Sequence, residues 1–360
     1  MSAYRTTNYP LNQQVIERNG YLYMKNQKTD SNVLLTITVL IIILFFSIFL
    51  NIMIGSVKLN PVDIINCLFG DDKSSVTYTL ITTVRVPRMV GGLFAGMGLA
   101  CSGVILQNVI NNSLASPNTI GINSGAGFAV MLSMILLPGN LAAMPAFAFT
   151  GAFITSLLIF LLAYFADSSR TTIILAGITV STFLNSGINT LKLLDTDITI
   201  NITSFMVGSL TGLTMKGLFL PAICISIAVI ISIILSRLLN ILNLGDDIAR
   251  SLGVNVSVIR FILLMLSSIM AGCVVSYAGL ISFVGLIVPH ICRHLFGNDS
   301  RLLLPCSALL GPIAVLSCDL IGKVILSPYE LPVGIILSFI GGPFFLYLLM
   351  KKKGGRRLNA

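Results

Sequence analysis

The sequence predicts an all-α, polytopic membrane protein, and its composition and its long apolar runs both indicate this class. Apolar residues make up 55% of the 360-residue chain, and charged residues only 10%. A soluble domain cannot bury that much apolar surface, whereas a bilayer accommodates it. A helix needs about 20 apolar residues to span the hydrocarbon core. Runs of this kind lie at residues 33–54, 89–110, 119–137, 141–165, 172–190, 217–238, 258–278, 280–296, 302–318 and 331–350, which predicts about ten transmembrane helices.

Two of these runs, 119–137 and 280–296, are short and interrupted. Gly285 and Pro289 lie inside the second, which is almost free of charge. Irregular backbone at membrane depth is tolerated only where protein buries it or where it lines a cavity. We therefore expect both segments to be broken helices inside the protein.

The placement of the basic residues predicts the orientation. If the N-terminus is cytoplasmic and the helices alternate, the inside segments hold most of the 22 Lys and Arg residues, so both termini are expected on the cytoplasmic side. The net charge of +9 is then a topology signal. It does not indicate nucleic-acid binding, because the basic residues form no stripe with aromatic residues.

The chain has one membrane domain. Residues 1–32 are polar, lack the apolar core of a signal peptide, and are expected to form a flexible cytoplasmic extension. The transmembrane domain is predicted over residues 33–350, with a cytoplasmic segment at 240–256 and a basic cytoplasmic tail at 351–360. The longest polar loops, 55–84 and 191–216, are too short for a second domain.

Two missing features bear on how such a protein would be energised. No GxxxxGK[ST] motif is present to cradle ATP phosphates. No apolar run carries the central carboxylate of a proton-coupled carrier, because Asp319 is predicted at the outer end of its helix. If the protein moves a solute uphill, the energy is expected to come from another subunit.

A metal or cofactor site is not expected. His290 and His294 lie four residues apart with Cys292 between them, but no carboxylate accompanies them. The seven cysteines are scattered, without a CxxC pair, and are interpreted as small packing residues.

Three segments admit both a structural and a functional interpretation. Arg85 and Arg88 precede the second run and are either interfacial anchors or a docking patch for an acidic partner. The small residues that follow at intervals of four, Gly92, Gly96 and Ala100, allow close helix packing. Residues 111–127 form either a cytoplasmic loop or a constriction of a pathway. Residues 244–255 form either a connector or a short helix on which a soluble partner acts.

A series of motifs decides between these interpretations by resemblance. RVPR, GLACSGVILQNVINNSLASPNTIGINSGAG, LAG at 175–177, LGDDIARSLGV, AGLISFVGLIVPHICRHLFGNDSRLLLP and ELPVGIILSFIGGPFF follow one another from about Arg85 to Leu349. The series resembles the permease subunit of binding-protein-dependent ABC importers for iron chelates and cobalamin. The resemblance implies a multi-pass protein of a bacterial cell membrane, with a type II importer fold of ten helices that dimerises around a translocation path. Two ATPase subunits would dock on the cytoplasmic side and an extracytoplasmic binding protein on the other.

The resemblance also implies roles for individual residues. Arg85, Arg88 and Lys323 match the basic residues that pair with carboxylates of the binding protein, with lysine where the family often has arginine. Asn112 and Leu114, followed by Ser169 and Arg170, match the two parts of the cytoplasmic gate. The ATPase-coupling segment corresponds to Leu244, Gly245, Asp246, Asp247, Ala249, Arg250, Ser251, Leu252 and Gly253.

The implied function is a transport subunit without enzymatic activity of its own, whose cargo is a ferric siderophore, or alternatively haem or cobalamin. The dimer would pair two copies of the chain, or this chain with a related permease. Two other classes are weighed against it. A secondary transporter or channel that works alone would need a coupling-ion site, and a membrane-embedded enzyme would need clustered catalytic residues; the sequence offers neither.

Overall fold

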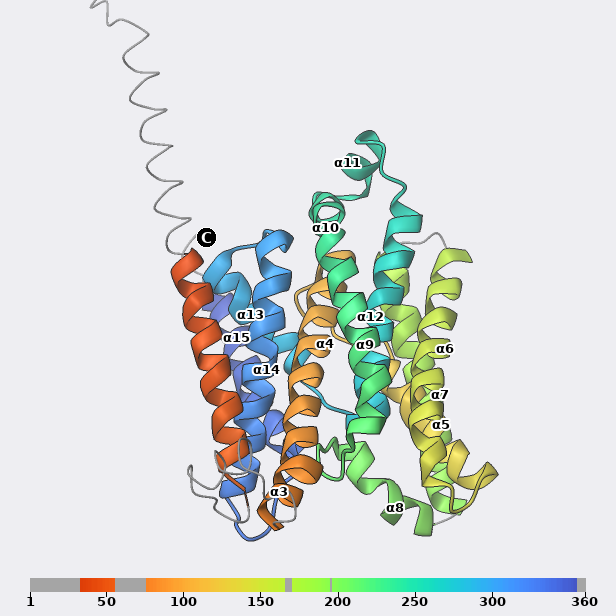
Figure 1. The fold of residues 1–360 in the computed structure, drawn as a ribbon. Coiled ribbons are helices and arrows are strands. Elements are labelled where there is room, and N and C mark those ends of the chain that lie inside the picture. The colour runs from red at the N-terminus through yellow and green to blue at the C-terminus, as the bar shows by residue number, and fades with distance from the viewer. Residues whose placement is uncertain (1–32, 56–75, 166–169, 195, 355–360) are drawn as a thin grey trace, which may run out of the picture. The chain divides into compact units, whose positions relative to one another are not determined.

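The computed structural model describes residues 33–55, 76–165, 170–194 and 196–354, which form helices joined by turns (Figure 1). The chain divides into two compact units, Met1–Ile43 and Leu44–Ala360. The described part of the first unit is the beginning of the helix Val33–Met53, where large side chains such as Leu34 and Leu35 are exposed. The second unit holds the end of that helix and all the other described elements.

The second unit is built from helices that differ widely in length. In chain order they are α3 (Val76–Leu80), a π-helical turn (Ile81–Arg85), α4 (Val86–Ile110), α5 (Ile122–Leu136), a 3₁₀ turn (Leu141–Ala143), α6 (Met144–Phe165), α7 (Arg170–Leu194), α8 (Thr196–Val207), α9 (Met215–Ile234), α10 (Ser236–Asn243), α11 (Asp246–Ser251), α12 (Val256–Ala278), α13 (Val284–Phe296), α14 (Ser300–Val324) and α15 (Val333–Gly354).

The predicted class, an all-α polytopic membrane protein, is confirmed for the described residues. Seven helices are long and apolar enough to cross a membrane, and three shorter apolar helices accompany them: Ile122–Leu136, Val284–Phe296 and Val333–Tyr347. The interrupted segments at 119–137 and 280–296 contain two of the short helices. The exact count of ten spans stays a prediction.

Two helical segments were predicted as loop. The helix predicted to begin at residue 89 begins at Val76. Within its first turns the threonine hydroxyls are satisfied by backbone carbonyls: Thr82 Oγ1 donates to the carbonyl of Tyr78 at 2.8 Å, and Thr83 Oγ1 to that of Thr79 at 2.6 Å. Helix α8 lies in the predicted loop 191–216 and buries Ile202 completely. At the other end of the chain, α15 continues through Gly354 into the predicted tail.

Helix α4 organises the second unit by close backbone contacts. It contacts α14, α12, α13, α9 and α10. A Cβ atom on Gly96 would lie 2.3 Å from the carbonyl of Gly311 in α14, and one on Gly103 would lie 1.9 Å from the carbonyl oxygen of Gly285 in α13. The small residues of α4 therefore bring helix backbones together, as the glycine spacing predicts.

The helix ends are set by local capping. Asn255 accepts the N–H of Val258 at 3.2 Å at the start of α12, and Asp299 accepts the N–H of Arg301 at 3.0 Å at the start of α14. Gly279 and Gly297, with φ of 70° and 80°, end α12 and α13. Each side chain or glycine satisfies groups that a helix end leaves unpaired.

Substituting Gly96 by alanine should separate α4 from α14 and lower the free energy of unfolding by about 1–3 kcal/mol, the usual cost of overpacking. Gly342 is the matched control, because nothing lies within 4 Å of a Cβ atom built there in α15. Gly342→Ala should leave stability unchanged or raise it slightly. Thermal unfolding midpoints of the two variants in detergent measure the difference, and equal midpoints would refute the packing argument.

Candidate functional site

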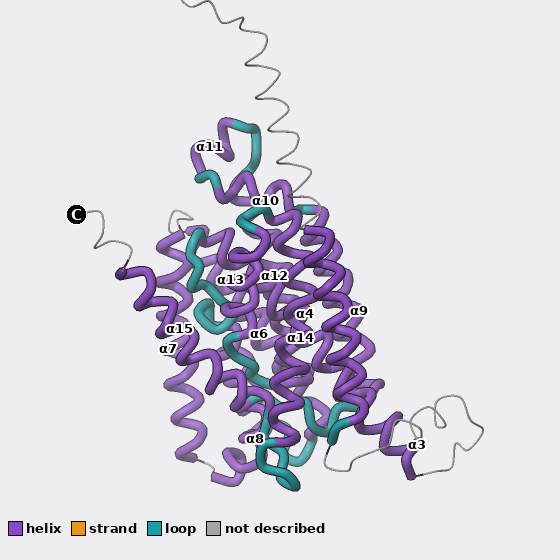
Figure 2. Tube along the Cα trace, turned by 90° about the vertical axis from the view of Figure 1, so that its left-hand side faces the viewer, coloured by secondary structure: helices purple, strands orange, loops and turns teal. Residues whose placement is uncertain are grey.

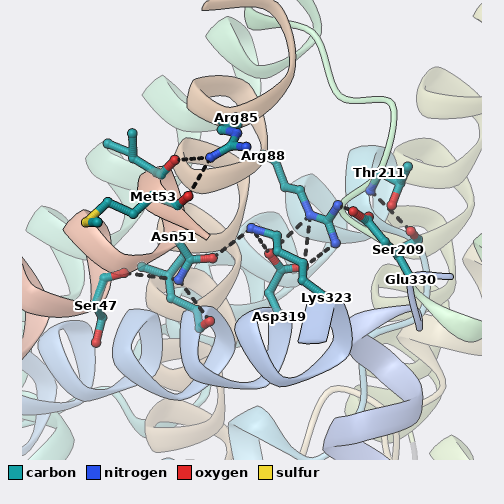
Figure 3. A network of polar contacts seen from close by, with 12 residues as sticks. Ser47, Asn51, Met53, Arg85, Arg88, Ser209, Thr211, Asp319, Lys323 and Glu330 are labelled. Atoms are coloured by element: carbon teal, nitrogen blue, oxygen red, sulfur yellow. Dashed lines mark hydrogen bonds and ion pairs between the residues drawn. The ribbon is translucent and has the colours of Figure 1, made fainter. Parts of the chain in front are cut away.

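A carboxylate near the end of α14 binds two cations (Figure 3). This end of α14 lies at the side of the bundle opposite α11 (Figure 1). Arg88 of α4 donates from Nε to Asp319 Oδ1 at 3.0 Å and from Nη2 to the same oxygen at 2.9 Å. Lys323, one turn further along α14, places Nζ 2.9 Å from Asp319 Oδ2. Asp319 is only 1% exposed. One buried anion thus compensates two buried cations, which joins α4 to α14.

Further contacts connect this cluster to the end of the first helix and to a loop. Nη1 of Arg88 donates to Glu330 Oε2, in the loop between α14 and α15. Asn51 accepts from Lys323 Nζ at 3.0 Å and donates to the carbonyl of Leu316 at 3.0 Å. We call Arg85, Arg88, Lys323, Asp319, Glu330 and Asn51 the charge cluster.

Arg85 completes the charge cluster from the π-helical turn. Its Nη1 donates to the carbonyls of Ile52 at 2.5 Å and Met53 at 2.8 Å, which end the first helix. A guanidinium group satisfies several carbonyls at once, so Arg85 provides donors for a helix end.

The structure corrects the expectation of an open basic patch. Arg85, Arg88 and Lys323 are 6%, 6% and 5% exposed, and their charged groups bind groups within the protein. The docking role came from the resemblance, and the second helix was predicted to begin at residue 89, which would leave both arginines at its mouth. Since the helix begins at Val76, they lie within it. Their pairing with a binding protein stays a prediction.

The first predicted gate residues lie where α4 ends. Asn111 adopts a left-handed conformation with φ of 52°, and the N–H of Asn112 donates to the carbonyl of Gln107 at 3.0 Å. Asn112 Oδ1 then accepts the N–H of Leu114 at 2.9 Å, and Leu114 is 40% exposed. This sharp turn begins the irregular segment before α5.

The second part of the predicted gate is only partly visible. Ser169 lies outside the described residues, and Arg170 is the first residue of α7. That these residues meet Asn112 and Leu114 stays a prediction.

A chain of neutral and charged polar groups connects α10 to the end of α4. Asn240 donates from Nδ2 to Asp299 Oδ1 at 2.7 Å and accepts the N–H of Ser300 at 2.8 Å. Ser300 Oγ lies 3.0 Å from Asn108 Nδ2 in α4. The pKa of the Asp299 carboxyl lies below its ordinary value because the N–H of Arg301 and the amide of Asn240 donate to it.

The polar chain continues from Asn108 to the gate turn. Arg293 of α13 donates from Nη2 to Asn108 Oδ1 at 3.0 Å and from Nη1 to Gln107 Oε1. Gln107 in turn donates from Nε2 to the carbonyl of Gly285 at 3.0 Å. Since the Gln107 carbonyl accepts from Asn112, hydrogen bonds extend from α10 to the predicted gate. We call this series, through Asn240, Asp299, Ser300, Asn108, Arg293 and Gln107, the polar chain.

The predicted coupling segment is a short helix that projects beyond α10 and α12 (Figures 1 and 2). As predicted, Asp246 and Asp247 lie in its first turn and Gly253 ends it, with φ of 80° and an N–H bound to the carbonyl of Arg250 at 2.9 Å. Arg260 of α12 holds Asp246 through Nη2 at 2.8 Å.

The coupling segment carries three exposed, large apolar side chains. Leu244, Ile248 and Leu252 are 60%, 49% and 59% exposed. Ile248 lies in α11, whereas Leu244 precedes Gly245, whose φ of 115° separates it from the helix, and Leu252 follows the last residue of the helix. Ala249, in contrast, is fully buried. We call the three exposed side chains the apolar stripe of the coupling segment.

No metal site is found in the part of the chain that the structure describes, where no group of three or more His, Cys, Asp or Glu side chains could hold an ion. His290 instead packs edge-on against Phe344, with ring centroids 6.1 Å apart.

Sequence reasoning missed most of the contacts that these residues make. Asp319 and Lys323 are four residues apart in an apolar run, and this spacing indicates a helical ion pair. Nothing in the sequence pairs Asp319 with Arg88, because 231 residues separate them. Glu330, Asn108 and Arg293 carry no local signal either, since their partners come from other helices.

The fold and these buried polar groups define a multi-pass helical membrane permease. A solved structure of a metal-chelate type ABC transporter in an inward-facing conformation has the same fold: it matches with a TM-score of 0.78 and 30% identity over 87% of this chain and 97% of the other. The fold is that of a type II ABC importer permease.

The chain belongs to the FecCD transport family, whose profile matches residues 41–351. It is 34% identical to the Fe(3+)-citrate import system permease protein YfmD of Bacillus subtilis, over 94% of this chain and 100% of that protein. It is 32% identical to the iron(3+)-hydroxamate import system permease protein FhuB of the same organism, over 85% of this chain and 80% of that protein.

Asp319→Asn should leave Arg88 and Lys323 buried without their shared anion and lower the free energy of unfolding by about 3–5 kcal/mol. Asp247→Asn, which removes an exposed carboxylate from α11, should change it by less than about 0.5 kcal/mol. Thermal unfolding of both purified variants in detergent compares them. If Asp319→Asn lowers the unfolding midpoint no more than Asp247→Asn does, the Asp319 carboxylate does not compensate the charges of Arg88 and Lys323.

Proposed function

We propose that this chain is the permease subunit of a binding-protein-dependent ABC importer and forms the translocation path for a ferric siderophore or a similar iron chelate, driven by ATP hydrolysis on a separate subunit. Support for the cargo comes from the relatives, which import iron citrate and iron hydroxamates by name. Cobalamin and haem are the alternative cargoes. The permease would work as a dimer, either with a second copy or with a related permease.

The observation that carries the proposal is the exposed apolar stripe of the coupling segment. Three large apolar side chains on and beside a short helix outside the bundle are costly to leave in water, and they suit a groove on a soluble partner. Acidic residues at the helix start add charge to the same surface. An ATPase subunit that closes on ATP would move this helix, so the stripe is its docking site and the membrane face beside it is cytoplasmic, as are both termini.

The polar chain provides a connection from α11 to the path. Helix α10 ends at Asn243, three residues before α11, and Asn240 begins the hydrogen bonds that extend to Gln107. We infer that ATPase motion shifts α10 and α11, rearranges the polar chain and changes the turn at Asn112 and Leu114. Buried hydrogen bonds break and form as discrete states, so they suit a gate with two positions.

Uptake by cells that lack their own iron-chelate permeases tests the cargo. The chain is expressed with its ATPase and binding protein, and accumulation of radioactive iron is measured from ferric siderophores, ferric citrate and haem, with labelled cobalamin alongside. Accumulation from an iron chelate supports the proposal, and accumulation of cobalamin alone would replace its cargo. Uptake that persists without any ATPase would favour a transporter that works alone.

Ile248→Glu should prevent assembly with the ATPase, because it places a charge in the middle of the apolar stripe. The control is Val258→Glu, an exposed apolar residue in the first turn of α12, where an acidic side chain suits the helix start. Copurification of the ATPase with each tagged variant gives the result. Equal recovery of the ATPase would show that the stripe is not the docking site.

Asn108→Ala should uncouple transport from hydrolysis, since it removes one of the two amide acceptors of Arg293 and the partner of Ser300 at the same time. We expect ATP hydrolysis to continue while uptake per ATP falls by about tenfold. Ser232→Ala is the control, because this buried hydroxyl donates to the carbonyl of Ala228 within its own helix and, among the described residues, joins no second helix. Parallel loss of hydrolysis and uptake in Asn108→Ala would indicate a merely structural role.

A further inference from the structure

The two carboxylates bound to Arg88 differ in how firmly they are held (Figure 3). Asp319 accepts from two nitrogens of Arg88 and from Lys323, and its side chain is 1% exposed. Glu330 accepts from a single nitrogen of Arg88, and its side chain is 25% exposed. Asp319 is therefore the permanent counter-ion of the cluster, and Glu330 is the one that can leave.

The loop that carries Glu330 faces outward. It connects α14 to α15 over residues 325–332, and Leu326 and Tyr329 within it are 54% and 79% exposed. The N–H of Tyr329 donates to the carbonyl of Leu326 at 2.9 Å, and that of Leu331 to the carbonyl of Gly322 at 3.0 Å. The side chains of Leu326 and Tyr329 are therefore accessible at this end of the bundle.

Formal charges show what Arg88 would accept in place of Glu330. Arg85, Arg88 and Lys323 contribute three positive charges to the cluster, against two negative charges from Asp319 and Glu330. Loss of Glu330 would leave Nη1 of Arg88 unpaired in a largely buried site, which is unfavourable. A carboxylate from outside would restore both the charge and the hydrogen bond.

We propose that Glu330 occupies on Arg88 the position that a carboxylate of the docking protein takes, so that docking exchanges one carboxylate for another and releases the loop at residues 325–332. This inference rests on the proposed dependence on a binding protein. It explains how Arg88 takes part in docking although it is 6% exposed. Glu330 also protects Arg88 from non-specific partners, because its carboxylate competes with any weakly binding acidic group from another protein.

The competition predicts a measurable gain in affinity when Glu330 loses its charge. The apparent Kd of a ligand rises by the inverse of the fraction of sites that are open. If Glu330 occupies Arg88 about nine-tenths of the time, Glu330→Gln should lower the Kd for the binding protein about tenfold.

The test uses the permease–ATPase complex in lipid nanodiscs and the importer's own loaded binding protein, with binding measured by surface plasmon resonance. Hydrogen exchange of residues 325–332 is followed with and without the binding protein. Wild-type loop amides should exchange faster only when the binding protein is present, whereas Glu330→Gln should exchange faster without it. Tyr329→Phe is the comparison, because it alters an exposed side chain of the same loop and leaves Glu330 in place; it should change neither the Kd nor the exchange of the loop amides.

The outcomes separate this inference from the proposed function. Tighter binding and a released loop in Glu330→Gln support the exchange. Unchanged or weaker binding of Glu330→Gln, with a wild-type complex that binds normally, overturns the exchange alone. A wild-type complex that assembles with its ATPase yet binds neither loaded nor empty binding protein overturns the proposed function, and the exchange with it.

Discussion

The ion pairs of the buried Asp319 carboxylate are the interactions on which the packing of α4 against α14 depends, at the end of the bundle away from α11. A charge inside a membrane protein is tolerated when a partner compensates it, and here one anion compensates Arg88 from α4 and Lys323 from its own helix. Asn51 joins the end of the first helix to the same group of residues. Because a buried ion pair requires a fixed distance between its partners, this cluster fixes the position of α4 relative to α14 at that end of the bundle.

The two ends of α4 differ in chemistry, and the difference suits different roles. Near its beginning, Arg88 is held by full charges at short range. Near its end, Gln107 and Asn108 hold Arg293 through neutral amide oxygens. Amide contacts are weaker than ion pairs and are exchanged more readily. The close contacts at Gly96 and Gly103 keep the middle of α4 fixed between them. A helix that is fixed at one end and held by exchangeable bonds at the other can pass a small displacement to the turn that follows it.

The sequence predicts the class and most helices, because a bilayer imposes long apolar runs that are visible without any structure. It also predicts α11, whose acidic first turn and terminal glycine are local signals. It fails at Val76–Arg85 and at α8, where threonine and asparagine give helices the composition of a loop. It fails for Arg88 in another way: the residue is identified as functional through resemblance, but its burial depends on Asp319 and Glu330, which only the folded chain brings to it. Ion pairs between helices that are distant in sequence form only in the tertiary structure, and the hydrophobic periodicity of the sequence does not predict them.

The measurement that tests the central claim most directly is ATP hydrolysis by the chain reconstituted in proteoliposomes with its ATPase and binding protein. The binding protein is presented empty and then loaded in turn with ferric siderophores, ferric citrate, haem or cobalamin. A permease that transmits docking at one end to an ATPase at the other predicts that hydrolysis rises with one loaded iron chelate above the level with empty protein. Hydrolysis that is the same with every form, or an ATPase that does not assemble with the chain, would contradict it.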